Sequence, residues 1–390
     1  MFYLKLAWRN ILRNKRRTII ASIAIGVGLA SMILTDGIMI GMKDNLVDSA
    51  TSTLLGEAQI HHKDFRHTQD VEKTIINKSE VLKELKKDNS VDKFSERTLS
   101  LGMITSPSTA ESVLVFGIDP DSDKYLSKID DRIREGSYFG NGGKREIVIG
   151  SKLAEVLEVS LGDRIVITVA QAFSGDLSQE MFLIGGIYHF NVKEMDNGMV
   201  LIRKERAQEM LNIGKEIHEI AVKFTGIRMA EDKKLPFWSK YGSGENEALS
   251  WSKIMPELKN MLDMTDVSLY MMGGILFFVV IFGIINALFM SLYERMFEFG
   301  ILKAVGTRPG GLRKLIIFEA ASLAVISNII GIILGFAGSV LLLKYGIDYG
   351  GIELSGAYMH EKIYPVMNIY QYIKYPVFVL IFTIIIGLYP

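Results

Sequence analysis

The sequence predicts a membrane α-helical protein with four transmembrane helices and a large extracytoplasmic α/β domain between helices 1 and 2. Three observations carry this prediction. Of the 390 residues 49% are hydrophobic and 23% are charged, which favours apolar spans joined to a soluble portion. Long charge-free stretches recur, and residues 43–266 between the first two have a mixed helix and strand pattern. Cations gather next to the ends of these stretches.

Composition excludes several classes of function. The formal net charge is zero, which gives no support for nucleic-acid binding. The absence of cysteine excludes disulfides, thiolate metal sites and cysteine nucleophiles. No Ser-His-Asp order or nucleophile elbow stands out, so a membrane-tethered enzyme is disfavoured.

Residues 1–17 are predicted to form an amphipathic helix in the headgroup region of the membrane. On a helical projection one face is apolar and carries Leu4, Ala7, Trp8, Ile11 and Leu12. The opposite face is cationic and carries Lys5, Arg9, Arg13, Arg16 and Arg17. This combination is typical of an interfacial helix, and a merely basic leader is the alternative.

Residues 18–42 are predicted to be the first span. Thr18 to Thr35 carries no charge, and the apolar stretch continues past Asp36. The alternative is a cleaved signal peptide, which usually has a shorter apolar core. Gly37 and Gly41 form a small-xxx-small pair that permits close helix packing. Six Lys or Arg residues precede the span, so the positive-inside rule places the N-terminus in the cytoplasm and the chain from residue 43 outside.

Residues 43–266 are predicted to form a soluble domain with its own core. Strand-like runs alternate with helical stretches, and turn residues separate them. The predicted strands are Glu57–His62, Val113–Ile118, Glu146–Ile149, Arg164–Val169, Phe182–Ile187 and Ile217–Phe224. The predicted helices are Lys78–Lys87, Lys152–Leu157, Arg203–Leu211 and Met255–Met264. We expect two subdomains, with residues 110–194 inserted into the other.

The C-terminal third is predicted to hold three more spans. Residues 267–293 contain no charge and form the second span, and residues 315–343 form the third. The loop 294–314 between them is rich in cations and is therefore assigned to the cytoplasm. After an outer loop at 344–374, residues 375–390 begin a fourth span. Its 16 residues make roughly 24 Å of helix, less than the hydrocarbon thickness, so the sequence is expected to be truncated.

The sequence offers no site for a nucleotide. Gly143-Lys144 superficially matches the end of a phosphate-binding loop. However, Arg145 follows instead of Ser or Thr, and Tyr138 stands where the first glycine is required. If ATP hydrolysis powers this protein, another subunit must bind the ATP.

A metal site is not favoured either. His61, His62 and His67 lie close to Asp64 in sequence, but no HExxH pattern exists. His61 and His62 follow a strand-like run in which neighbours point to opposite faces. We expect these histidines to be solvent-exposed at a strand end, with metal binding as the alternative.

Glu319 is a candidate functional residue because it lies about four residues inside the third span. Ionisable residues within a membrane segment are functional candidates by default. Two interpretations remain open, a structural pairing with a basic residue of the loop and a role in conformational coupling. Asn286 and Asn328, in mid-span, are predicted to form hydrogen bonds between helices.

The cytoplasmic loop is predicted to contain a short helix that meets another protein. Glu294–Val305 is long enough for three helical turns, and Gly306 and Pro309 are stop signals. Charged and apolar positions are mixed along it. A solvated connector is the alternative interpretation.

This loop resembles the coupling helix of the permease family that includes the lipoprotein-releasing permeases LolC and LolE, the macrolide-exporter permease MacB and the division protein FtsX. Phe299 and Lys303 depart from the commoner isoleucine and arginine. Glu319 matches a glutamate of the family's next span, and Gly387-Leu388-Tyr389-Pro390 is similar to the start of a Gly-x-Tyr-Pro-Ala motif. By resemblance, the residues that couple to an ATPase are Glu294, Arg295, Glu298, Gly300, Leu302, Lys303, Ala304 and Gly306.

The soluble domain resembles the same family. Three blocks of that domain occur in the family's order, namely Gly117–Pro120, Ile149–Ala154 and Leu161–Asp163. The stretch Gly185–Ile187, followed by Met195-Asp196, is more similar to the lipoprotein-releasing branch than to the exporter branch. The resemblance therefore covers nearly the whole chain.

The resemblance implies a permease subunit of an ATP-binding-cassette transporter, without catalytic residues, in the bacterial inner membrane. Its implied partners are a cytoplasmic ATPase dimer that binds ATP and magnesium, a second permease (identical or a paralogue), membrane lipids, a lipoprotein substrate and a periplasmic carrier chaperone. The implied function is the extraction of lipoproteins from the outer leaflet through mechanical transmission. Alternatives are a MacB-like efflux permease for drugs, peptides or toxins, and an FtsX-like switch for an extracytoplasmic enzyme.

Overall fold

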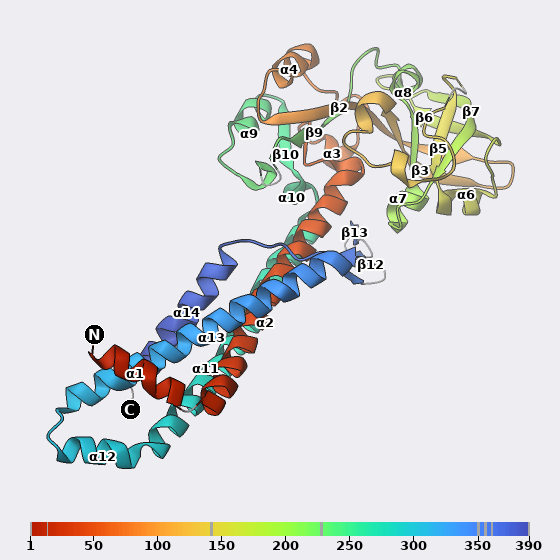
Figure 1. The fold of residues 1–390 in the computed structure, drawn as a ribbon. Coiled ribbons are helices and arrows are strands. Elements are labelled where there is room, and N and C mark those ends of the chain that lie inside the picture. The colour runs from red at the N-terminus through yellow and green to blue at the C-terminus, as the bar shows by residue number, and fades with distance from the viewer. Residues whose placement is uncertain are drawn as a thin grey trace. The chain divides into compact units, whose positions relative to one another are not determined.

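The computed structural model describes residues 2–13, 15–140, 143–226, 229–348, 352–354, 357–359 and 362–388 (Figure 1). The chain divides into two compact units. We call the first, Met1–Asn45 with Leu262–Gly350 and Glu361–Pro390, the helical unit. The second, Leu46–Met261 with Gly351–His360, we call the sheet unit.

Three long helices of the described chain are apolar enough to cross a membrane. They are the stretches Thr18–Leu55, which includes the π turn after α2, Pro256–Glu294 and Pro309–Tyr345. Along the chain the helices with residues in the helical unit are α1 (Phe2–Arg13), α2 (Lys15–Ala50), α11 (Pro256–Glu294), α12 (Met296–Ala304), α13 (Pro309–Tyr345) and α14 (Gln371–Ile386). The predicted fourth span corresponds to α14, whose 16 residues are too few to place it with the other three. The count of four spans is therefore not confirmed, and Tyr389 and Pro390 of the terminal motif lie outside the described residues.

Apolar side chains from α2, α11, α13 and α14 form the core of the helical unit. Ile25, Leu29 and Ile33 of α2 pack with Val280 and Ile284 of α11 and with residues of the other two helices. Because Gly26 has no side chain, α2 approaches α13 closely at Gly331; a Cβ atom on Gly331 would lie 2.9 Å from the Gly26 carbonyl oxygen. In α1, Ala7 and Ile11 are buried while Arg9 is exposed, as the amphipathic pattern predicts.

The pair Gly37 and Gly41 packs against an extended segment and not against another helix. A Cβ atom on Gly41 would lie 2.0 Å from the carbonyl oxygen of Tyr364, and one on Gly37 would lie 3.1 Å from that of Val366. The Val366 amide also donates a 2.9 Å hydrogen bond to the Gly37 carbonyl. The two glycines therefore allow a close approach, but the predicted packing against another helix is corrected, because the partner is the extended chain that leads into α14.

The sheet unit is built on one mixed sheet. Its strand order is β10-β1-β9-β2-β3-β8-β5-β7-β4, and β6 pairs with β2 and β7. The strands are β1 (Ala58–His62), β2 (Val91–Thr105), β3 (Ala110–Ile118), β4 (Ile133–Gly136), β5 (Glu146–Gly150), β6 (Arg164–Ala170), β7 (Leu177–Tyr188), β8 (Met199–Arg203), β9 (Glu219–Phe224) and β10 (Asn246–Ser250). Most neighbours are antiparallel, whereas β3 with β8 and β5 with β7 are parallel.

Short helices connect these strands. They are α3 (Phe65–Thr68), α4 (Lys78–Leu85), α5 (Pro120–Asp123), α6 (Ser151–Leu157), α7 (Lys193–Gly198), α8 (Lys204–Leu211), α9 (Pro236–Tyr241) and α10 (Trp251–Ile254), with a π turn at Thr51–Leu55 and 3-10 turns at Asp130–Arg132 and Met229–Glu231. Two small hairpins pair β11 (Ile347–Asp348) with β14 (Lys362–Ile363) and β12 (Ile352–Leu354) with β13 (Ala357–Met359). The predicted strands and helices of this region are present, with two corrections to their bounds. Strand β7 begins at Leu177, five residues before the predicted start. The predicted helix Met255–Met264 does not end at Met264, because it is the first part of α11, which continues to Glu294.

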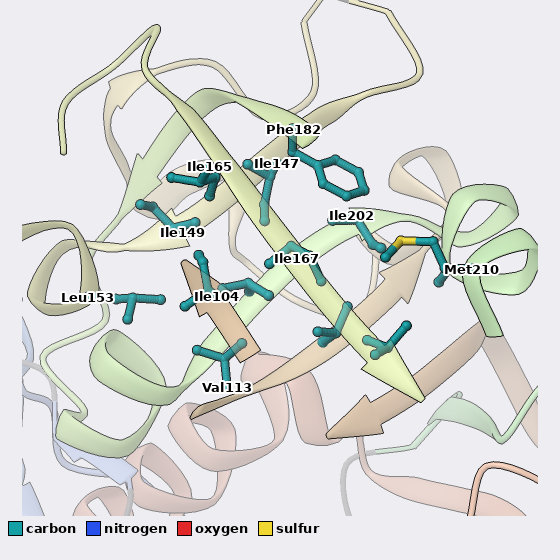
Figure 2. Close-up of a cluster of buried hydrophobic side chains, with 14 of the residues drawn as sticks. Ile104, Val113, Ile147, Ile149, Leu153, Ile165, Ile167, Phe182, Ile202 and Met210 are labelled. Carbon is teal, nitrogen blue, oxygen red and sulfur yellow. The ribbon is translucent and has the colours of Figure 1, made fainter. Parts of the chain in front are cut away.

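The largest apolar core of the sheet unit lies between β2, β3, β5–β8 and the helices α6 and α8. Figure 2 shows its side chains, among them Ile147, Ile167 and Phe182. A second core contains Leu99 of β2 and Tyr188 of β7. The predicted insertion at 110–194 covers β3 to β7. Strand β8, which follows it in sequence, lies between β3 and β5, so the insertion stays a prediction.

The expectation of exposed histidines is wrong for His61. Strand β1 lies inside the sheet, between β10 and β9, and the His61 side chain is fully buried. Burial lowers the pKa of His61 to about 4 and keeps the ring neutral at physiological pH. No group of three or more His, Cys, Asp or Glu residues suited to a metal ion occurs in the part of the chain that the structure describes.

Candidate coupling site

The connection between α11 and α13 begins with a turn at Arg295. Helix α11 ends at Glu294, Arg295 leaves the helical conformation with φ −107° and ψ 8°, and α12 starts at Met296. The sequence predicted one helix from Glu294 to Val305, so its start is corrected by two residues. The turn occurs here because the Arg295 side chain lies buried among carboxylates, which fixes its backbone between the two helices.

The C-terminus of α12 is followed by a glycine that terminates the helix. Gly306 has φ +96°, a conformation that side chains disfavour, and the Thr307 amide donates to the Leu302 carbonyl at 3.0 Å. Pro309 is the first residue of α13, where its missing amide proton costs nothing. The sequence interpreted Pro309 as a stop signal, and the structure corrects this to a helix start.

A chain of ion pairs joins four segments of the helical unit. Arg295 donates to Glu319 of α13 at 2.5 Å through Nη1 and to Glu298 of α12 at 3.0 Å through Nε. Glu298 also accepts from Arg13 of α1 at 2.5 Å. Ser291, one turn from the end of α11, donates to the other oxygen of Glu319 at 3.4 Å. We call Arg13, Arg295, Glu298 and Glu319 the charge network.

The inner half of the charge network is shielded from solvent. The side chains of Arg295 and Glu319 are 8% and 15% exposed. The Arg295 guanidinium also lies over the Phe299 ring, 5.1 Å from its centroid. A charged group in this position is stable only if it is paired; Glu319 has Arg295 as its ion-pair partner, whereas Arg295 has both Glu319 and Glu298. Of the two interpretations of Glu319, the structural pairing is therefore present, and a coupling role stays a prediction.

The outer half of the charge network is open to solvent. The side chains of Arg13 and Glu298 are 57% and 41% exposed. Hydrogen bonds from Arg295 and then from Arg13 lower the pKa of Glu298, which favours its ionised form. Solvent screening makes each of these exposed contacts weak, so they set the position of α12 relative to α1 more than they stabilise the fold.

Helix α12 presents an unpaired apolar face. None of its residues is buried, and Phe297 and Ile301 are 80% and 50% exposed, followed by Val305 at 82%. A side chain added at Gly300 would meet no atom within 4 Å, so this glycine is not required by packing within the chain. Exposed apolar patches are found at surfaces that contact another protein or a membrane. We call Phe297, Gly300, Ile301 and Val305 the α12 face.

The structure divides the sequence-predicted coupling residues into two groups. Arg295, Glu298 and Glu319 come together in the charge network, whereas Glu294, Gly300, Leu302, Lys303, Ala304 and Gly306 are exposed. Sequence reasoning did not assign Arg13 to this site, because its spacing gave only a cationic face of the N-terminal helix. The available signal was Glu319, because an acid in an otherwise apolar stretch requires a cation nearby.

These features together define a class of protein: a membrane subunit with a large mixed α/β domain between its first two spans and a short helical connection between the next two. Family profiles identify the family. The MacB-like periplasmic core domain matches residues 18–232, and the FtsX-like permease C-terminal domain matches residues 270–390. The chain belongs to the MacB/FtsX-like family of ATP-binding-cassette transporter permeases. Members of this family are typically non-catalytic and work with an ATPase partner and a paired permease.

Relatives at low identity carry lipoprotein-release names. The lipoprotein-releasing system transmembrane protein LolC of Buchnera aphidicola (strain Sg) is 22% identical over 395 aligned residues, which cover 99% of this chain and 94% of that protein. The protein LolE of Haemophilus influenzae is 21% identical over 89% of this chain and 84% of that protein. The periplasmic region of MacB from Actinobacillus actinomycetemcomitans is a similar structure, with a TM-score of 0.37 and 13% identity, covering 55% of this chain and 96% of that one.

Proposed function

We propose that this chain is the permease of a transporter that extracts lipoproteins from the outer leaflet of the inner membrane and releases them to a carrier. The observation that carries the proposal is the similarity to LolC over 99% of the chain, which includes both the spans and the sheet unit. In this proposal the N-terminus and residues 294–314 lie in the cytoplasm and residues 43–266 lie outside. A cytoplasmic ATPase dimer binds ATP and magnesium, and a second permease completes the complex.

The charge network suggests how force would pass through such a permease. The α12 face docks on the ATPase, so α12 moves when the ATPase dimer closes. Arg295 ties the start of α12 to Glu319 in α13, and the peptide chain ties it directly to α11. A displacement of α12 is therefore passed to both long helices instead of being absorbed by a flexible linker. Arg13 adds α1 to the same moving group through Glu298.

Topology is tested first, because the proposal requires the two ends of α11 to face opposite compartments. The chain has no native cysteine, so single cysteines at Ser90 and Thr307 are unambiguous labelling sites. In intact cells a membrane-impermeant maleimide should label the cysteine at position 90 and spare the one at position 307. Equal labelling of both from outside would contradict the arrangement.

Substrate release is tested with the chain in proteoliposomes together with the ATPase with which it co-purifies. We expect ATP-dependent transfer of a triacylated lipoprotein to a soluble carrier, and no ATP hydrolysis by the purified chain alone. The matching control is the same protein without its lipid anchor, which should not be transferred. If instead a non-acylated peptide or a macrolide were moved, the efflux function suggested by the MacB-like domain would replace lipoprotein release.

A further inference from the structure

The sheet unit contains a cavity of about 660 Å³ that no part of the coupling mechanism uses. Its residues come from β1, β2, β3, β8 and β9 and from the short helices that cover them. The π turn directly after α2 contributes Leu54 and Leu55, and the residues just before and inside α11 contribute Met255 and Glu257.

The volume is that of a ligand site. Folded interiors rarely leave voids larger than a water molecule, whereas sites for small molecules measure roughly 300–1,000 Å³. The lining is mainly apolar and includes Leu101, Leu114, Met195 and Met199. Unbranched methionine side chains adapt to an irregular apolar partner, so this lining suits a flexible hydrocarbon.

Several polar side chains of the lining are already satisfied inside the sheet unit. Thr53 donates to the Ala50 carbonyl at 2.7 Å, and Gln59 donates to the Leu55 carbonyl at 3.0 Å. Ser100 donates to the carbonyl of Leu101 at 2.9 Å. A bound peptide backbone would need hydrogen-bond partners from the wall, and these groups are already engaged. A hydrocarbon chain needs none.

The exposed lining residues carry charge of both signs. Arg66 is exposed and is held by hydrogen bonds to the side chain of Gln59 at 3.0 Å and to the Ile254 carbonyl at 3.4 Å. Glu194 and Glu257 are also exposed. An amphiphile with an apolar tail and a polar head fits this distribution, with the tail inside and the head beside these groups.

We propose that this cavity binds one long aliphatic chain of a lipid or of a lipid-anchored cargo. The inference deepens the proposed function and rests on it for the cargo as the source of the chain. A site of this kind would hold an acyl chain outside the hydrocarbon layer during release, where exposure to water would otherwise oppose the transfer.

The test uses the full chain in lipid nanodiscs and a palmitate analogue that carries a photoreactive diazirine. We expect saturable labelling of peptides that contain Leu101, Leu114 or Met199. Leu101→Glu should lower this labelling by about fivefold or more, because a charge is placed in the apolar wall. Leu101 is 55% exposed in the free chain, so the substitution leaves the fold intact.

Met103→Glu is the matched control. Met103 lies on the same strand and the same side as Leu101, is 46% exposed and does not line the cavity. Labelling should stay at the wild-type level in this variant. Labelling that does not saturate, or that falls equally in both variants, would overturn the proposal.

Competition then identifies the source of the chain. If a diacylated lipopeptide displaces the probe and lysophospholipid competes at least about tenfold more weakly, the bound chain comes from the cargo. If the two compete equally, the bound chain comes from a membrane lipid, and the cavity has no link to release. Neither labelling nor competition involves α12. Association with the ATPase is therefore measured in the same samples as an independent test of the proposed function. Failure of the cavity and failure of the proposed function are thereby distinguished.

Discussion

Removing the charge of Arg295 should cost more stability than neutralising Glu319, although the two side chains form one ion pair. In Arg295→Met, Glu319 loses its 2.5 Å partner and keeps only the 3.4 Å contact with Ser291. Removing one partner of a buried pair costs about 3–5 kcal/mol, and we expect the lower end because the Glu319 side chain is 15% exposed.

In Glu319→Gln the remaining cation is still well accommodated. Arg295 keeps Glu298 at 3.0 Å and the ring of Phe299, and the new amide oxygen still accepts a hydrogen bond. We therefore expect a loss of about 1–2 kcal/mol, in the range of one hydrogen bond to a charged group. Glu298→Gln is the control on the exposed side of the same arginine, with an expected loss of about 1 kcal/mol or less.

The assay is thermal unfolding of the full chain in nanodiscs, with all three single variants and the double variant of Arg295 and Glu319. Because the two residues contact each other, the double-mutant cycle should give a coupling energy of about 1–3 kcal/mol. A coupling near zero would refute the pairing, and equal losses in the two single variants would refute the predicted difference between Arg295 and Glu319. If the pair also transmits force, ATPase activity should no longer respond to cargo in Arg295→Met while binding of the ATPase is retained.

Three further outcomes follow from other parts of the chain. Gly300→Trp, or the paired reversal of Glu298 and Lys303, should weaken co-purification with the ATPase or uncouple hydrolysis from release. The fold should survive in Gly300→Trp because the site is open; normal binding and release would make the loop a mere connector. Burial lowers the pKa of His218 to about 4, below its unfolded value of 6.5, so the stability of the sheet unit falls as the pH drops through this window. His218→Asn should remove about 3 kcal/mol of that pH-dependent change, and an unchanged slope in pH-dependent unfolding would contradict the assignment. Finally, Arg97→Leu should cost about 3–5 kcal/mol because Arg97 is fully buried between Asp123 and Glu219. Lys124→Leu removes an exposed ion pair and an exposed contact with the Tyr125 ring and should cost about 0.5 kcal/mol; similar unfolding midpoints for the two variants would count against a buried ion cluster.

The strands that the sequence predicts are those with short, dense runs of apolar residues, such as β5 and β6. The longest strand, β2, was not predicted, because Lys93, Ser95 and Arg97 interrupt its apolar pattern. Arg97 is buried there only because it pairs with Asp123 at 2.6 Å and with Glu219 at 3.1 Å, and its Nη1 also donates to the carbonyl of Leu54. These partners lie 26 to 122 residues away along the chain, so no local sequence pattern predicts the pairing.

The charge network was partly predictable for a related reason. Glu319 stands out because an acid in an apolar stretch needs a cation, and this need can be inferred from the sequence alone. The choice of Arg295 among the five cations of the loop was not visible, because it depends on the turn that separates α11 from α12. The cavity of the sheet unit was not foreseen at all, since its walls come from segments spread between Thr53 and Glu257.

The length of β2 has a practical consequence for dividing this protein into pieces. Its first half pairs with β9 and its second half with β6, and it pairs with β3 along residues 97–105. Leu99 and Ile104 on this one strand also belong to the two different cores. An expression fragment limited to residues 110–194 would lack both β2 and β8, and would leave the edges of β3, β5 and β6 without partners. The smallest fragment worth crystallising therefore runs from the π turn to the end of α10, because Trp251 directly after β10 is buried, and it should melt in a single transition.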